Sequence, residues 1–143
     1  MTSNASRLGM FRSVLEIFGI VLLRFRPLPR IWGAWLVAVN SASLLFIRHP
    51  EAQVTLAAVG VAVLAQALIY QRRRFIRLLG LTHLLWVPML AWMALRLPAV
   101  PAEHAAFRAW LVVLMATNAA SLLVDACDAT RFVLGERRPH YAW

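Results

Sequence analysis

The sequence has little of what a soluble enzyme normally uses. It holds a single cysteine, Cys127, no lysine, and only six acidic residues among 143. A lone cysteine excludes an internal disulfide and a cysteine-rich metal site. The chain also has no glycine-rich phosphate loop and no nucleophile elbow. These absences favour a non-enzymatic protein, and no set of residues selects a cofactor.

Hydrophobic residues are abundant instead. They make up 62% of the chain, and the mean hydropathy is +0.68. Four apolar runs free of Asp, Glu, Lys and Arg cover residues 31–47, 54–70, 78–95 and 109–124. Each is near the lower end of the roughly 17 to 25 residues that cross a bilayer as a helix. The runs lack the alternation of a membrane β-barrel. They predict an all-α integral membrane protein, a four-transmembrane-helix bundle.

The basic residues predict how this bundle is oriented. All 15 are arginines, the net charge is +9, and they gather at the ends of the apolar runs. Orientation in a membrane explains that placement, so a nucleic-acid partner is not expected. The most basic loop carries Arg72, Arg73, Arg74 and Arg77, and it should face the cytoplasm. Both termini are then cytoplasmic in a bacterial inner membrane, with anionic lipid as a partner at that face.

The N-terminal segment 1–30 is expected to lie on the cytoplasmic side. Its residues 10–26 are apolar over most of a helix surface, with Arg12 and Glu16 one turn apart and prolines at 27 and 29. This pattern predicts an amphipathic helix on the membrane surface, with a fifth crossing as the alternative. The membrane domain is then 31–128, and 129–143 is a basic cytoplasmic tail.

Several polar residues interrupt the apolar runs. At 100° per residue, Asn118, Ser121, Asp125 and Asp128 fall on one stripe of a helix. Asn40, in an antiparallel span, has a depth similar to that of Asn118, so the two amides could meet. Such residues are either hydrogen-bonding contacts between helices or the lining of a small pocket that opens toward the cytoplasm. The candidate residues are Asn40, Gln66, Thr82, His83, Asn118, Ser121 and Asp125.

His83 and Asp125 are ionisable residues within the spans, which are costly in lipid and often functional. A His–Asp pair could carry a proton or hold a quinone oxygen. The alternative is a neutral histidine bonded to Gln66 or Asn118, with Asp125 at the lipid headgroups. At the helix end, Asp128 and Arg131 join a cytoplasmic charged cluster with Arg72, Arg73, Arg74 and Arg77.

One segment carries a resemblance to a known family. LEIFGIVLLRF, residues 15–25, followed by PRIW, residues 29–32, resembles the first helix of the small multidrug resistance transporters. The resemblance implies that Glu16 binds protons and cationic drugs in turn within a dimer. The chain departs from that family in its later helices, which lack the characteristic aromatic and glycine-rich pattern.

These patterns favour a non-enzymatic accessory, assembly or lipid-interacting subunit, either within a larger membrane complex or as a homo-oligomer. The alternative is a small oligomeric proton-coupled transporter that uses Glu16, or His83 with Asp125. A third hypothesis, a metal-dependent membrane enzyme, rests on the acidic stretch from Asp125 to Arg131.

Overall fold

The computed structural model describes residues 2–73 and 77–135, with side chains described for 9–72 and 79–135. Over these residues the secondary structure is helical and contains no strand, which confirms the all-α prediction. The α-helices are α1 (Thr2–Gly19), α2 (Pro27–Ser41), α3 (Pro50–Arg73), α4 (Trp86–Arg96) and α5 (Ala105–Val133).

Prolines mark several helix starts. α2 begins at Pro27 and α3 at Pro50, positions where the missing N–H of proline costs no helical hydrogen bond. Pro88 lies in the first turn of α4, and the preceding segment η3 (Arg77–Leu85) is 3₁₀-helical. Because Pro88 cannot donate to the carbonyl of residue 84, an α-helix that extended back through this point would lose that hydrogen bond.

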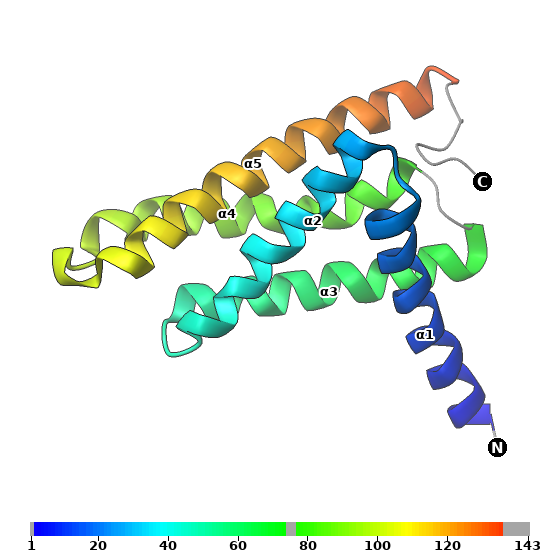
Figure 1. Ribbon diagram of the computed structural model, residues 1–143, viewed down its shortest axis with the longest axis horizontal. Helices are drawn as coiled ribbons and strands as arrows, with labels where there is room; N and C mark the ends of the chain where they lie inside the picture. Colours follow the sequence, from blue (N-terminus) through cyan, green and yellow to red (C-terminus); the bar gives the residue numbers. More distant parts are fainter. Residues whose placement is uncertain (1, 74–76, 136–143) are drawn as a thin grey trace.

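Four helices surround the main core. α2 crosses α3, α4 and α5, which run side by side in Figure 1. The core between them includes the fully buried Met93, Leu111 and Leu114. Phe46 stacks on Trp110 with ring centroids 5.1 Å apart. Burial of these large side chains fixes how α2 packs on the other helices.

α1 lies outside this core. In Figure 1, α1 runs steeply past the C-terminal end of α3. There, Ile17 and Ile20 pack against Ala67 and Tyr70. A π-helical turn, η1 (Ile20–Arg24), follows it. The sequence pattern predicted a helix over about 10–26; in the structure α1 begins at Thr2, and a wider helical turn replaces the α-helix after Gly19.

Three helices of the described residues are long and apolar enough to cross a membrane: Pro50–Arg72, Leu79–Ala99 and Ala102–Val133. They contain the second and fourth apolar runs and all of the third except its first residue, Leu78. The first run lies in α2 and the 3₁₀ segment η2 (Ala42–Phe46), which directly follows it. Large apolar side chains such as Leu45 and Leu95 face outward, as lipid-facing residues do. The described helices therefore fit a membrane protein in their length and apolar composition.

Candidate functional site

Hydrogen bonds inside the bundle join α2 to α5. The Asn40 and Asn118 amides donate to each other, with N···O distances of 2.9 and 3.1 Å, and both residues are buried. Beside them, the Trp35 indole N–H donates to the Thr117 hydroxyl at 3.1 Å. The Trp110 indole N–H donates to the Val39 carbonyl at 3.0 Å. These contacts connect the two helices through polar groups that would otherwise be left unsatisfied in an apolar interior.

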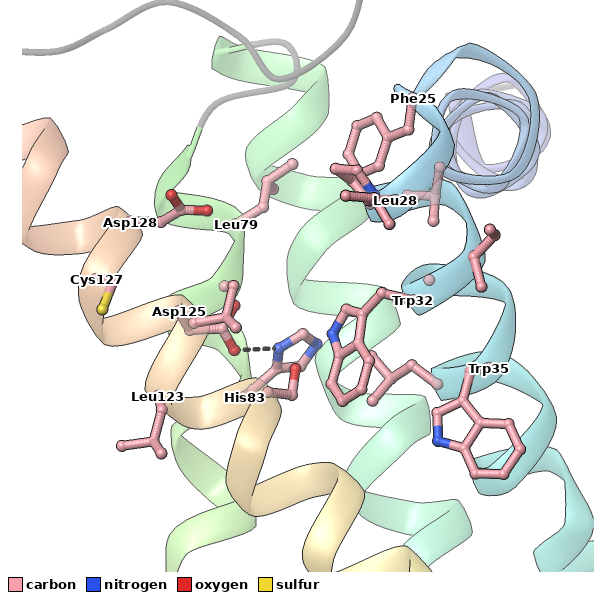
Figure 2. Close-up of a pocket in the computed structure, with 18 of the residues that line it drawn as sticks. Phe25, Leu28, Trp32, Trp35, Leu79, His83, Leu123, Asp125, Cys127 and Asp128 are labelled. Atoms are coloured by element: carbon pink, nitrogen blue, oxygen red, sulfur yellow. Dashed lines mark hydrogen bonds and ion pairs between the residues drawn. The ribbon is translucent and has the colours of Figure 1, made fainter.

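A second cluster connects α3, η3 and α5. His83 Nδ1 lies 2.8 Å from Asp125 Oδ2, and His83 Nε2 lies 3.1 Å from the Gln66 amide nitrogen. The Trp86 ring stacks on the imidazole, with centroids 4.1 Å apart. Figure 2 shows the His83–Asp125 contact beside a pocket. Each imidazole nitrogen therefore has a partner from a different element.

The two partners of His83 limit where its ring protons can lie. An amide nitrogen only donates hydrogen bonds, so His83 Nε2 accepts from Gln66 while Nδ1 carries a proton and donates to Asp125. The imidazole is neutral in this arrangement. If the Gln66 amide turned over, its oxygen would accept a proton from Nε2, and an imidazolium would fit equally well. The cluster can therefore hold His83 in either charge state.

Gly80 allows Asp125 to approach the backbone of η3. A Cβ atom at position 80 would lie 2.2 Å from Asp125 Oδ1 and 2.9 Å from Asp125 Cβ. Any residue with a side chain would therefore displace the carboxylate. Sequence reasoning missed Gly80, although a glycine within an apolar helical run was a usable signal of close approach.

An open groove of about 1080 Å³ runs beside this cluster. One wall comes from η1, from α2 with Trp32 and Trp35, and from Phe25 between these two elements. The other wall comes from η3 and α5 and carries His83 and Asp125 (Figure 2). The groove is mostly apolar. Its polar lining consists of Gln66, His83, Ser121, Asp125, Asp128 and Arg131, with Cys127 nearby.

The predicted polar residues do not form a single cluster in the structure. Gln66, His83, Ser121 and Asp125 line the groove. Asn40 and Asn118 instead bond to each other, and the Thr82 hydroxyl donates to the Leu79 carbonyl of its own turn.

The predicted charged cluster is described only in part. Asp128 and Arg131 line the groove, and Arg72 is exposed near the end of α3. The side chains of Arg73, Arg74 and Arg77 lie outside the described part of the chain.

Glu16 connects α1 to α3. It accepts hydrogen bonds from Arg12 Nε at 2.8 Å and from the Tyr70 hydroxyl at 2.9 Å. The hydrogen bond and charge of Glu16 raise the pKa of the Arg12 guanidinium above its ordinary value, so this partner stays cationic. The carboxylate that the transporter resemblance implies as a substrate site is therefore bonded to two neighbours within the protein.

The start of α3 and the end of α4 are joined by an ion pair between a buried glutamate and a half-exposed arginine, which sequence reasoning missed. Glu51, 3% exposed, accepts a hydrogen bond from Arg96 Nε. The sequence contained a signal for this pair, because Glu51 and Arg96 flank neighbouring antiparallel spans at the same end. Close by, the His49 ring stacks on Phe107. Among the described residues, no group of three or more His, Cys, Asp or Glu could hold a metal ion.

Comparisons with known protein families, with curated proteins and with solved structures found no match to this chain.

Proposed function

We propose that the chain is a small multi-pass protein of a bacterial inner membrane that serves as a non-enzymatic accessory or lipid-interacting subunit. The observation that supports this role most is the internal pairing of polar side chains. The Asn40–Asn118 amides and the Trp35–Thr117 contact join helices to each other. Such pairing is expected of residues that hold a bundle together.

In this proposal α2 is a fourth crossing, and both termini are cytoplasmic. α2 and η2 run from Pro27 to Phe46 without interruption. At ~1.5 Å per α-helical residue and ~2.0 Å per 3₁₀ residue, this length is close to the ~30 Å hydrocarbon thickness. The arginine-rich end of α3 then lies at the cytoplasmic face, where anionic lipid is its natural contact.

The outer surface of α3 is a reasonable place to look for a partner subunit. Ala57, Gly60, Leu64 and Leu68 are exposed along one side of the helix, and its small residues allow another helix to approach closely. A photoreactive amino acid at Leu64 in native membranes should crosslink to a larger membrane protein. The same group at Leu123, exposed on the groove side of α5, is the matched control and should give less of that product.

Native mass spectrometry of the protein, purified from its own membrane in mild detergent, tests the accessory role directly. The proposal predicts a stoichiometric complex with a larger membrane protein, together with retained lipid. A monomer or homodimer without such a partner, and no crosslinked product at Leu64, would contradict it.

A second candidate function is proton-coupled transport by a small oligomer. It is favoured by the Gln66–His83–Asp125 chain, which accommodates a neutral or a protonated imidazole beside an open groove. Neutral substitutions separate the two candidates. Asp125→Asn should abolish transport while leaving an accessory subunit assembled, and Glu16→Gln should spare both, because Glu16 is held by Arg12 and Tyr70.

A further inference from the structure

We infer that the groove binds a membrane-soluble phenolic molecule, which has an aromatic ring with a hydroxyl group and an apolar tail. A reduced quinone, or hydroquinone, has this chemistry. In the bound state the hydroxyl group bridges Ser121 and Asp125, which both line the groove, and the ring packs on the aromatic wall. The inference concerns a ligand of the groove and goes beyond the accessory role, because it needs no partner subunit.

The first observation is a buried serine hydroxyl group without a hydrogen-bond partner. Ser121 of α5 is 4% exposed and lines the groove. Within the described residues its hydroxyl group makes no hydrogen bond. The Trp86 indole nitrogen is the one polar side-chain atom there that is both fully enclosed and unbonded, so the Ser121 hydroxyl group can be reached from the groove. A buried hydroxyl group is costly unless another group bonds to it.

The second observation is a carboxylate one turn along the same helix. The Asp125 side chain is 18% exposed, and it also lines the groove. In the part of the chain that the structure describes, its single hydrogen-bond partner is His83. Because a carboxylate can accept about four hydrogen bonds, Asp125 has acceptor capacity left for a ligand. A hydroxyl group that donates to a carboxylate forms one of the stronger hydrogen bonds in proteins.

A ligand hydroxyl group fits between these two residues. Positions 121 and 125 are ~6 Å apart along the helix axis, and an O–H···O hydrogen bond spans about 2.7 Å. One hydroxyl group can therefore accept from Ser121 and donate to Asp125. A carbonyl oxygen in the same place would accept from Ser121 but would turn a lone pair toward the carboxylate. The two residues together thus select a hydroxyl group over a carbonyl group.

The opposite wall selects the rest of the ligand. Phe25, Trp32 and Trp35 line it, and in Figure 2 the Trp32 ring points toward His83. Aromatic rings gain from packing on one another beyond the apolar area that they bury. The volume of about 1080 Å³ is just above the roughly 300 to 1000 Å³ of typical small-molecule sites. A space this large with a mostly apolar lining accommodates a ring together with an apolar tail.

The test compares two probes that differ only in their redox state. Decylubiquinol and decylubiquinone share their ring substituents and tail, but only decylubiquinol has hydroxyl groups to donate. Binding to the full-length protein in lipid nanodiscs is measured by equilibrium dialysis without oxygen, and binding to empty nanodiscs is subtracted. Decylubiquinol should bind saturably, and decylubiquinone about tenfold or more weakly. Equal binding of the two probes would overturn the inference, because the groove would then take any apolar molecule.

Two further probes test the ring. 4-Nonylphenol has an aromatic ring with one hydroxyl group, whereas farnesol has a hydroxyl group and an apolar tail but no aromatic ring. Farnesol should bind about threefold or more weakly than 4-nonylphenol, and equal binding of these two would contradict recognition of a phenol. Comparison with decylubiquinol identifies the source of the phenol. Similar binding of 4-nonylphenol assigns the site to phenols in general, and binding at least about tenfold weaker assigns it to hydroquinones.

Variants assign the effect to the two bridging residues. Ser121→Ala breaks no internal hydrogen bond and should weaken decylubiquinol binding by about threefold to tenfold. Ser41→Ala, at an exposed position outside the groove, is the matched control and should leave binding unchanged. Asp125→Asn should weaken decylubiquinol binding by about tenfold or more and reduce its advantage over decylubiquinone.

Thermal unfolding of each variant confirms that it is folded. Unchanged binding in a folded Ser121→Ala variant would show that no hydroxyl bridge forms. A folded Asp125→Asn variant with the full preference for decylubiquinol over decylubiquinone would contradict the role of the carboxylate. Either result would overturn the inference.

Discussion

At the scale of single residues, Gly80 determines how closely Asp125 can pack. Gly80→Ala would place a methyl group 2.2 Å from the carboxylate, so the side chain must move or η3 must shift. We expect a loss of about 1 to 3 kcal/mol in unfolding free energy, together with loss of the His83–Asp125 hydrogen bond. Thermal or denaturant unfolding in detergent measures the first effect, and imidazole NMR the second.

Gly60→Ala is the matched control for this substitution. A Cβ atom at Gly60 meets nothing within 4 Å, and the residue lies inside α3. The substitution should be neutral or stabilising by up to about 1 kcal/mol. If Gly80→Ala behaved like Gly60→Ala, the close approach of Asp125 to η3 would be wrong.

The Asn40–Asn118 amide pair should couple α2 to α5 energetically. Asn40→Ala and Asn118→Ala each leave a buried amide without its partner, whereas the double variant removes both groups. A double-mutant cycle should give a coupling of about 0.6 to 2 kcal/mol. Ser41→Ala, at an exposed neighbouring position, should change stability by less than about 0.5 kcal/mol. Strictly additive effects of the two asparagine substitutions would show that the pair does not hold the helices together.

At the scale of helices, the Glu51–Arg96 pair joins the start of α3 to the end of α4. Arg96→Met would leave the Glu51 carboxylate buried without this partner, and we expect a loss of about 1 to 3 kcal/mol. Arg108→Met removes an exposed arginine near the same end and should cost less than about 0.5 kcal/mol. Equal melting temperatures for the two variants would contradict a structural role for the pair.

Helix positions could be predicted from the sequence better than helix types and ends. The apolar runs predicted where α2 to α5 lie, because each of these helices must present a continuous apolar surface to the core or to lipid. The 3₁₀ segments were not predicted, since their geometry depends on local packing and on Pro88. The start of α1 was also missed, because its first residues carry no strong helical pattern.

For the candidate site, the depth of each polar residue along its helix could be predicted from the sequence, but its hydrogen-bond partners could not. Depth along antiparallel helices brought Asn40 and Asn118 to one level, and the structure pairs them. The same reasoning from the sequence placed Gln66 and His83 at a similar depth. Which side of each helix faces which neighbour depends on helix rotation, and that rotation is set by core packing. The division into an amide pair and a groove could therefore not be read from spacing.

At the scale of the whole molecule, the arginines divide between the two ends of the bundle. Arg72 and Arg131 lie near the ends of α3 and α5, and Arg26 immediately precedes α2. Arg48 and Arg96 lie at the opposite ends of their spans. The groove itself needed the whole fold, because its walls come from segments far apart in the sequence. No local pattern predicted it.

We propose that the chain crosses the bilayer four times, with α2 as one of the spans. Labelling of single cysteines in a Cys127→Ser background by a membrane-impermeant thiol reagent, in intact cells and in inverted vesicles, tests it most directly. Arg26→Cys, Gln53→Cys and Gln71→Cys place exposed thiols before α2, after η2 and at the end of α3. We predict labelling of positions 26 and 71 from the cytoplasmic side only, and of position 53 from the outside only. Labelling of positions 26 and 53 from the same side would show that α2 does not cross the bilayer.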